Sequence, residues 1–278
     1  MSEKEKFENE FEKEMIDLLV LTKTSTGGGA VVGEFIRPVV YFIASVNLQT
    51  GEFSHESGVL TWMAKRKEEN WGYNFQSFEI YHIRVRKSMP MPLKAGQSTA
   101  WNHRYLVVQV VDKQTTHPQL EALQARLKQP VVIEDAIGKF VLDRKFSCFE
   151  GDVNWLGTSC NVVLNTDVED GETAEKALDV LHMLYADLKN WDHRFQAYAA
   201  EKLVEGANDW LQDELEEGEE ADPITEEDFA KRIVISMIDI EADGSITVYY
   251  NDDDMFWGHT VVVYTDQNRE MKDADIIG

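Results

Sequence analysis

The residues best suited to chemistry lie close together near the C-terminus, where three aspartates precede Met-Phe-Trp-Gly-His. Asp252, Asp253, Asp254 and His259 offer oxygen and nitrogen ligands that a divalent cation could use. Consecutive side chains of an extended segment point in alternating directions, so the three carboxylates converge only in a special loop. Their spacing matches neither a calcium loop nor a zinc motif. The pattern therefore favours a solvated hairpin turn, in which Trp257 anchors the neighbouring strand.

A second candidate site is a tight turn at residues 154–157, which follows Glu150 on a predicted strand. Aromatic side chains are favoured at protein interfaces, so Trp155 at this hairpin tip is a candidate binding anchor. The favoured alternative is an ordinary turn whose tryptophan folds back on the sheet. The candidate binding residues are therefore Glu150, Trp155, Asp252, Asp253, Asp254, Trp257 and His259, and no residue is assigned as catalytic or as a metal ligand.

Other patterns are weaker signals of function. The glycine run at residues 27–29 lacks the Gly-Lys-Ser/Thr of a phosphate-binding loop, so a flexible loop is expected. No Ser or Cys has a His/Asp arrangement that can be read from the sequence, which is weak evidence against an enzyme because triads assemble from distant positions. A modest basic group is too small for a nucleic-acid surface and is expected on an edge strand or against the acidic half of a neighbouring molecule. It comprises Arg84, Arg86, Lys87 and Lys94.

Charge divides the chain into two unlike halves. Residues 1–130 contain 16 Lys+Arg and 15 Asp+Glu, whereas residues 131–278 contain 11 and 36, so the net charges are +1 and -25. Part of this excess lies in the acidic tract at residues 213–222, which is expected to be a solvated linker. A strongly negative field attracts cationic partners and repels nucleic acid and anionic membranes. We therefore expect a protein partner that is basic, no nucleic acid and no membrane, and the oligomeric state stays open.

The composition is that of a folded, reduced protein. With 43% hydrophobic and 10% aromatic residues, a chain of 278 residues can form one large or two ordinary domains. The charged N-terminus is no secretory signal, and the longest apolar run, at residues 39–46, is too short to span a bilayer. In the predicted hairpin Cys160 faces Gly151 and not Cys148, so a disulfide is not expected. We expect reduced thiols, a cytoplasmic location and no cofactor.

The N-terminal half, residues 1–130, is predicted to be a mostly β domain with short helices. Apolar residues at three-to-four spacing predict an opening helix that contains Phe7, Phe11, Met15, Leu18 and Leu19. Strands are predicted at residues 38–47, 78–87 and 104–112, and a short helix at residues 118–128. Gln129 and Pro130 end this helix and mark the expected domain boundary.

The C-terminal half, residues 131–278, is predicted to be an acidic α+β domain. Strands are expected at residues 139–143, 149–153 and 158–164, and two helices with apolar stripes at residues 174–188 and 195–210. Thr225 and Asp228 form a capping-box pattern for a third helix. Three more strands are expected at residues 233–240, 245–251 and 258–264. The order βββ-ααα-βββ indicates a largely antiparallel sheet packed by helices.

Three segments in this order carry a resemblance to a known family. They are G-K-F-V-L-D-R-K-F-S-C-F-E-G-D-V-N-W-L-G at residues 138–157, A-A-E-K-L-V-E-G-A-N-D-W-L at residues 199–211 and D-M-F-W-G-H at residues 254–259. Together they resemble bacterial domain-of-unknown-function family 2262, over about residues 131–278, and the first half resembles the uncharacterised domain that often precedes it. The family has no assigned activity, so the resemblance implies a bacterial cytoplasmic protein. Many small acidic α+β bacterial proteins are antidotes to toxins, and extending that role to this chain is an analogy.

Three functions follow from these observations. The first is a non-enzymatic protein-binding module, whose most specific form is an immunity or inhibitor protein against a basic toxin domain. An alternative is a metal-dependent hydrolase that uses the carboxylates of residues 252–254 with Glu150 and His259, which requires these groups to converge in a cleft. The third is a structural subunit of a larger complex, in which the two halves bind different proteins.

Overall fold

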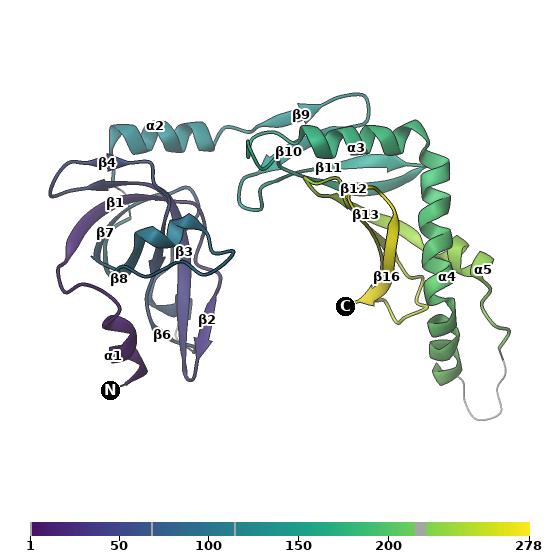
Figure 1. Cartoon of the computed structure of the whole chain (residues 1–278), viewed down its shortest axis with the longest axis horizontal. Helices are drawn as coiled ribbons and strands as arrows, with labels where there is room; N and C mark the ends of the chain where they lie inside the picture. The colour runs from purple at the N-terminus through teal and green to yellow at the C-terminus, as the bar shows by residue number, and fades with distance from the viewer. Residues whose placement is uncertain (1, 68, 114, 215–220) are drawn as a thin grey trace. The chain divides into compact units, whose positions relative to one another are not determined.

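The computed structural model describes residues 2–67, 69–113, 115–214 and 221–278, so most of the predicted linker at residues 213–222 lies outside the described residues. The chain divides into two compact units, Met1–Gln129 and Pro130–Gly278, each with its own apolar core (Figure 1). In the described part of the chain, no helix combines the length and the apolar character that a membrane span requires.

The N-terminal unit consists mostly of strands. Its elements are α1 (Glu3–Glu8), β1 (Ile16–Thr22), β2 (Gly29–Val32), β3 (Phe35–Asn47), β4 (Phe53–Ser54), β5 (Gly58–Thr61), β6 (Ala64–Lys65), the 3-10 helix η1 (Glu69–Gly72), β7 (Ile80–Lys87), the 3-10 helix η2 (Thr99–His103), β8 (Arg104–Asp112) and α2 (Pro118–Leu127).

Five of these strands close into a barrel. β1 pairs with both β3 and β7, β3 pairs with β5, β5 with β8, and β8 with β7. Four of these pairings are antiparallel, and β5 runs parallel to β8. This strand order is that of the OB-fold, a five-stranded Greek-key barrel. Closure pairs both edges of each strand in the ring, and apolar side chains such as Val20, Phe42, Leu60 and Ile83 fill the inside.

The prediction of an opening helix is wrong for the second half of that segment. The helix ends at Glu8, and Leu18 and Leu19 lie in β1 instead. Leu18 packs inside the barrel, whereas Leu19 packs on the outside with Leu120 of α2. A strand that is buried on both faces has a continuous apolar run, without polar alternation. That run extended the helical spacing of the residues before it and produced the wrong prediction.

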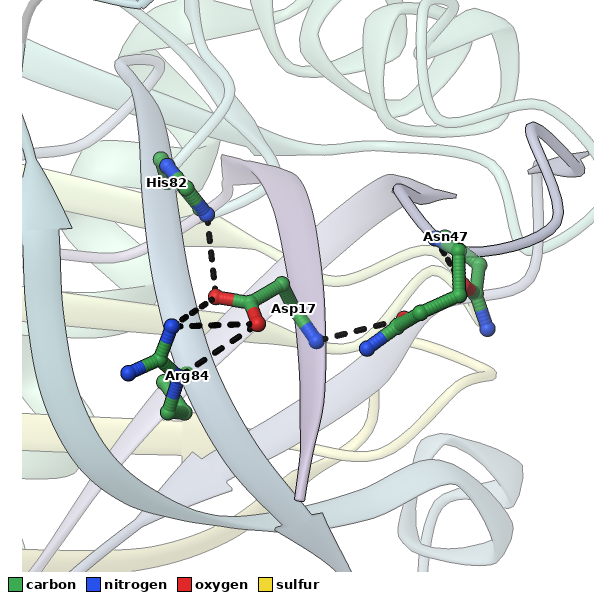
Figure 2. A network of polar contacts seen from close by, with 5 residues as sticks. Asp17, Asn47, His82 and Arg84 are labelled. Carbon is green, nitrogen blue, oxygen red and sulfur yellow. Dashed lines mark hydrogen bonds and ion pairs between the residues drawn. The ribbon is translucent and has the colours of Figure 1, made fainter.

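An outward-facing polar network joins β1 to β7 (Figure 2). The Asp17 carboxylate accepts hydrogen bonds from Arg84 at 3.2 and 3.3 Å and pairs with His82 Nε2 at 3.1 Å. The backbone N–H of Asp17 donates to Gln49 Oε1 at 3.3 Å, which connects the network to the turn after Asn47 at the end of β3. Arg84 therefore neutralises a carboxylate of its own barrel.

Arg86, the next basic residue of β7, is used to hold α1. Its guanidinium donates to the backbone carbonyls of Glu8 at 3.1 Å and Phe11 at 3.0 Å. A cation at the Glu8 carbonyl is favourable, because the last carbonyls of a helix carry partial negative charge and lack partners within the helix. Half of the predicted basic face is thus committed to internal contacts, and Lys87 and Lys94 are its exposed members.

The C-terminal unit has the predicted α+β class, with one more strand at each end than expected. Its elements are β9 (Val132–Glu134), β10 (Lys139–Asp143), β11 (Cys148–Trp155), β12 (Thr158–Asn165), α3 (Glu175–Ala186), α4 (Leu188–Glu214), α5 (Glu226–Arg232), β13 (Val234–Ile240), β14 (Ile246–Asn251), β15 (Thr260–Thr265) and β16 (Met271–Ile277).

All eight strands form one sheet in the order β16-β15-β14-β13-β12-β11-β10-β9. Neighbouring strands are antiparallel except β12 and β13, which are parallel because the three helices intervene between them. These helices cover one face of the sheet (Figure 1). The buried side chains between them include Val162, Ile238, Val248 and Val263 of the sheet and Leu181 of α3.

The β11–β12 hairpin turns at residues 156–157, later than the register we predicted. Both residues have positive φ, as a two-residue hairpin turn of type I′ requires. Cys160 therefore pairs with Val153, and the predicted pairing with Gly151 is wrong by two residues. The two cysteines are free and buried, and burial is the largest cause that raises the pKa of Cys148 and of Cys160 to about 12 each.

Candidate functional site

The loop between β14 and β15 is held by a buried carboxylate. Asp252 is 4% exposed, and its side chain accepts hydrogen bonds from the backbone N–H groups of Phe256 at 2.7 Å, Gly258 at 3.2 Å and Asp254 at 3.3 Å. Three backbone donors compensate the burial of this side chain. Asp252 is therefore a structural cap of the loop, which corrects its interpretation as a binding residue.

The other two aspartates of this loop point elsewhere. Arg232 of α5 donates from Nε to Asp253 Oδ2 and from Nη2 to the Asp253 carbonyl, each at 2.8 Å. The Asp254 side chain is exposed. Asp253 and Asp254 have φ angles of 51° and 58°, in the left-handed region that aspartate tolerates better than most residues. The backbone thus separates three consecutive carboxylates into one buried, one paired and one facing solvent.

The aromatic residues of the loop divide in the same way. Phe256 is fully buried and packs against Trp210 of α4 at 5.5 Å and Phe229 of α5 at 6.1 Å between ring centroids. Trp257 is 59% exposed and lies 4.6 Å from Trp210. Phe256 therefore anchors the strand, a role that the sequence pattern suggested for Trp257.

His259 closes the loop against α4. Its ring meets Trp210 edge-on at 5.5 Å, and its Nδ1 lies 2.6 Å from the Phe256 carbonyl. These contacts place His259 beside aromatic rings and a backbone carbonyl. The structure therefore brings Asp254, Trp257 and His259 together on one loop, whereas Asp252 is turned inward.

Trp155 lies in the core and is not available to a partner. It is 1% exposed, and its indole Nε1 donates to Asp192 Oδ1 of α4 at 2.8 Å. The interpretation of Trp155 as a binding anchor is thus corrected in favour of the folded-back turn. Asp192 is desolvated by the same packing, and this burial raises the pKa of its carboxyl.

Glu150 does not lie with the aspartate loop. It is on β11, and β12 and β13 separate that strand from β14. The residues paired with Glu150 through β12 and β13 lead to Thr247 on β14, whereas the loop begins only after Asn251. Among the described residues, no group of three or more His, Cys, Asp or Glu side chains could hold a metal ion. The convergence of Glu150 with the loop that the hydrolase hypothesis requires is therefore not present.

A larger acidic surface lies on the face of the C-terminal sheet that its helices do not cover. Paired residues of neighbouring strands share a face, so the register defines two rows across this surface. One row is Glu150, Val163, Asp239, Thr247, Tyr264 and Asp273, and the other is Asp152, Asn161, Met237, Tyr249, Val262 and Asp275. Neither row contains a Lys or Arg, and we call these two rows the acidic face.

Two carboxylates here have raised pKa values: Asp239 within the acidic face and Glu241, which follows β13 and lies outside the two rows. Burial raises the pKa of Asp239, which accepts a hydrogen bond from Asn165 Nδ2 at 2.6 Å. Burial is also the main cause that raises the pKa of Glu241, at the end of β13, and the negative charges of Asp239 and Asp243 add to it. These carboxylates are less stable as anions than isolated ones, and a nearby cation would stabilise them.

Sequence reasoning missed this surface although it located five of its six strands; β16, which carries Asp273 and Asp275, was not predicted. Alternation along β11 assigns Glu150 and Asp152 to one face, but alternation within one strand does not show which residues of distant strands share it. The parallel pairing of Val163 with Asp239 connects the two halves of the sheet, and the long helical connection hides that pairing.

Comparison with known families completes the description. The model of the family described as "Uncharacterized protein conserved in bacteria (DUF2262)" matches residues 134–276, and the model of the "Domain of unknown function (DUF7021)" matches residues 3–127. No curated protein and no solved structure matches the chain. The first family covers more than half of the chain, so the protein belongs to this uncharacterised bacterial family, and the resemblance seen in the sequence is confirmed.

Proposed function

We propose that this member of an uncharacterised bacterial family is a non-enzymatic protein-binding module, and that the acidic face docks a cationic surface of another protein. The observation that carries the proposal is the pair of rows across the sheet, which combine five carboxylates with two tyrosines and no basic residue. Tyrosine is enriched at protein interfaces because it contributes apolar area and a hydroxyl with little loss of side-chain entropy.

The charge supports a cationic partner over a neutral one. Residues 131–278 have a net charge of -25, so their field accelerates the encounter with a basic protein and does so less as salt is added. Lysine and arginine side chains would pair with carboxylates such as Asp239 and Glu241, whose pKa values are raised because burial disfavours their charged forms. Charge complementarity of this kind contributes to specificity as well as to association rate.

The most specific form of this proposal is an inhibitor that covers a basic toxin domain. Such a domain would present a lysine- and arginine-rich active surface, and an extended acidic sheet face is a complementary shape and charge for it. A structural subunit of a larger complex is the alternative form, and it predicts a partner that is held without loss of that partner's activity.

The test begins with capture of a partner from the source bacterium at low salt, followed by direct titration of the purified partner. The informative variant is Glu150→Lys with Asp152→Lys, on the acidic face. Its matched control is Glu205→Lys with Asp209→Lys, two exposed acidic residues of α4, the helix on the opposite face. Both double variants change the net charge by the same amount, so a difference between them reports the site and not the total charge.

We expect a basic partner whose affinity falls at least tenfold in the acidic-face variant and about twofold or less in the α4 variant, by analogy with charge pairs at other interfaces. Equal losses in both variants would mean that only the overall charge matters. A partner that is acidic, or one that both variants bind as tightly as the unchanged protein, would refute docking on the acidic face. Co-expression with the partner then separates inhibition from simple assembly.

A further inference from the structure

The N-terminal barrel contains a cavity that the proposed function does not use. It has a volume of about 270 Å³ and lies beneath the connection between β7 and β8, residues 88–103. Barrel mouths and the loops around them are frequent positions of ligand sites. In OB-type barrels the loop between the fourth and fifth strands contributes to ligand binding, and residues 88–103 form the corresponding connection here.

One wall of the cavity is apolar. Trp101 of η2 and the run Met89, Pro90, Met91, Pro92 and Leu93 line it. Met89 and Met91 are 48% and 58% exposed, so their side chains are accessible to a ligand in the cavity. Methionine adapts its shape to a bound group, and the two prolines limit the conformations of the segment that carries it.

The lining also contains a buried arginine. Arg104 lines the cavity and is 7% exposed, with its guanidinium 4.6 Å from the Phe11 ring centroid and 5.7 Å from that of Trp101. Its Nη2 donates to Glu10 Oε2 at 2.7 Å, whereas its buried Nε has no hydrogen-bond partner among the described residues. A buried donor without an acceptor is costly, so an additional acceptor beside this guanidinium would be stabilising.

Further donors border the same space. Lys87 is exposed and forms no ion pair with a described residue, and the side chains of Ser88 and Asn102 make no hydrogen bond within the described part of the chain. The lining contains two cations, Lys87 and Arg104, and one carboxylate, Glu12. Because Arg104 is already paired with Glu10, Lys87 is the lining cation without an ion-pair partner among the described residues. The lining of the cavity therefore combines cationic, hydroxyl and amide donors with aromatic and methionine side chains.

We propose that this cavity binds the carboxylate of a ligand with an apolar body. The carboxylate accepts from Lys87, with Arg104 and Asn102 beside it, and the apolar body lies against Trp101 and the methionines. The volume suits a group about the size of one amino acid. The same chemistry occurs in a free carboxylic acid and in the C-terminus of a peptide, and the choice of probes distinguishes these two sources.

The test uses the full chain and three probes: isocaproate, N-acetylleucine and N-acetylleucinamide. Binding is followed by NMR, through the indole N–H signal of Trp101, which the Trp101→Phe variant assigns. We expect one or both acids to shift this signal and the amide not to do so. A response to N-acetylleucine alone indicates a peptide C-terminus, and a response to isocaproate indicates a free acid. Equal binding of the acid and its amide, or no response to any probe, would overturn the proposal.

Lys87→Gln is the informative variant, and Lys94→Gln is its matched control. Both lysines are exposed, and both lie at or near the β7–β8 connection, but Lys94 does not line the cavity. Loss of a charge-assisted hydrogen bond predicts about tenfold weaker binding of the acid by Lys87→Gln, with Lys94→Gln within about twofold of the unchanged protein. Asn102→Asp, which adds a carboxylate to the lining, should abolish binding. Equal effects of the two lysine variants would contradict the assignment.

Discussion

Trp155 and Asp192 join the end of β11 to the first turns of α4 through a single hydrogen bond of 2.8 Å from the indole Nε1 to Oδ1. The indole is 1% exposed, and it also meets Tyr185 of α3 edge-on at 6.0 Å between ring centroids. A tryptophan at a hairpin tip therefore reaches back to both helices, and this contact fixes how the hairpin meets them.

Replacing Trp155 by Phe removes this donor and leaves the Asp192 carboxylate without it. We expect a loss of about 1–3 kcal/mol in the free energy of unfolding, since a partly buried charged acceptor loses its partner. Urea denaturation measures the change. In the background of Asp192→Ala the same substitution should cost clearly less, and equal costs in the two backgrounds would show that the hydrogen bond contributes nothing.

Asp252 allows a second prediction. Asp252→Ala leaves the backbone N–H groups of Phe256, Gly258 and Asp254 without their acceptor, so we expect a loss of about 2–4 kcal/mol in the free energy of unfolding. Asp254→Asn, which changes an exposed side chain in the same loop and keeps a residue type that tolerates positive φ, should stay within about 0.5 kcal/mol. Near-ultraviolet circular dichroism gives a second readout, because Trp257 lies 4.6 Å from Trp210. A similar loss in the two variants would contradict the role of Asp252.

These two residues also show what could be read from the sequence. In the C-terminal unit the α+β class, the three helices and six of the eight strands were predicted from periodicity, and the end strands β9 and β16 were not. The roles within the Asp252, Asp253 and Asp254 run could not be predicted, because they depend on positive φ angles at the second and third aspartate. Such angles are a property of the folded loop that Phe256 anchors, and neighbouring residue types do not determine them.

Tertiary context also explains the wrong prediction at the N-terminus. Leu18 and Leu19 are apolar for different reasons, one for the barrel interior and one for the contact with α2. Periodicity alone cannot separate a strand buried on both sides from a continuation of an amphipathic helix. The acidic face was missed for a related reason: its two rows depend on a parallel pairing between strands far apart in the chain.

The buried thiols give a third prediction. The thiolate is the reactive form, and a pKa of about 12 leaves only about one thiol in 10⁵ ionised at neutral pH. We therefore expect neither Cys148 nor Cys160 of the native protein to react with iodoacetamide, and both to react in urea, as measured by mass spectrometry. Burial is the largest cause of each raised pKa, and Glu150 adds to that of Cys148. Glu150→Gln should thus speed labelling of Cys148 and not of Cys160, and rapid labelling of both in the unchanged native protein would contradict the burial.

The acidic face predicts opposite pH dependences for binding and for stability. Burial raises the pKa of Asp239 and of Glu241, so both lose their charge at a higher pH than ordinary carboxylates do. A cationic partner binds the ionised form, so its affinity should fall with decreasing pH, and this fall should begin at a higher pH than for ordinary carboxylates. For folding the sign is reversed, because a raised carboxyl pKa means that the folded state binds more protons than the unfolded state. The contribution of these two groups to stability is therefore present at low pH and is lost as the pH rises through their folded pKa values.

Calorimetric titrations at constant ionic strength measure the affinity, and urea denaturation at the same pH values measures the stability. Asp239→Asn should flatten both profiles, whereas Asp254→Asn, on the β14–β15 loop, should leave them unchanged. Equal pH profiles of the affinity in Asp239→Asn and in the unchanged protein would show that Asp239 does not contact the partner.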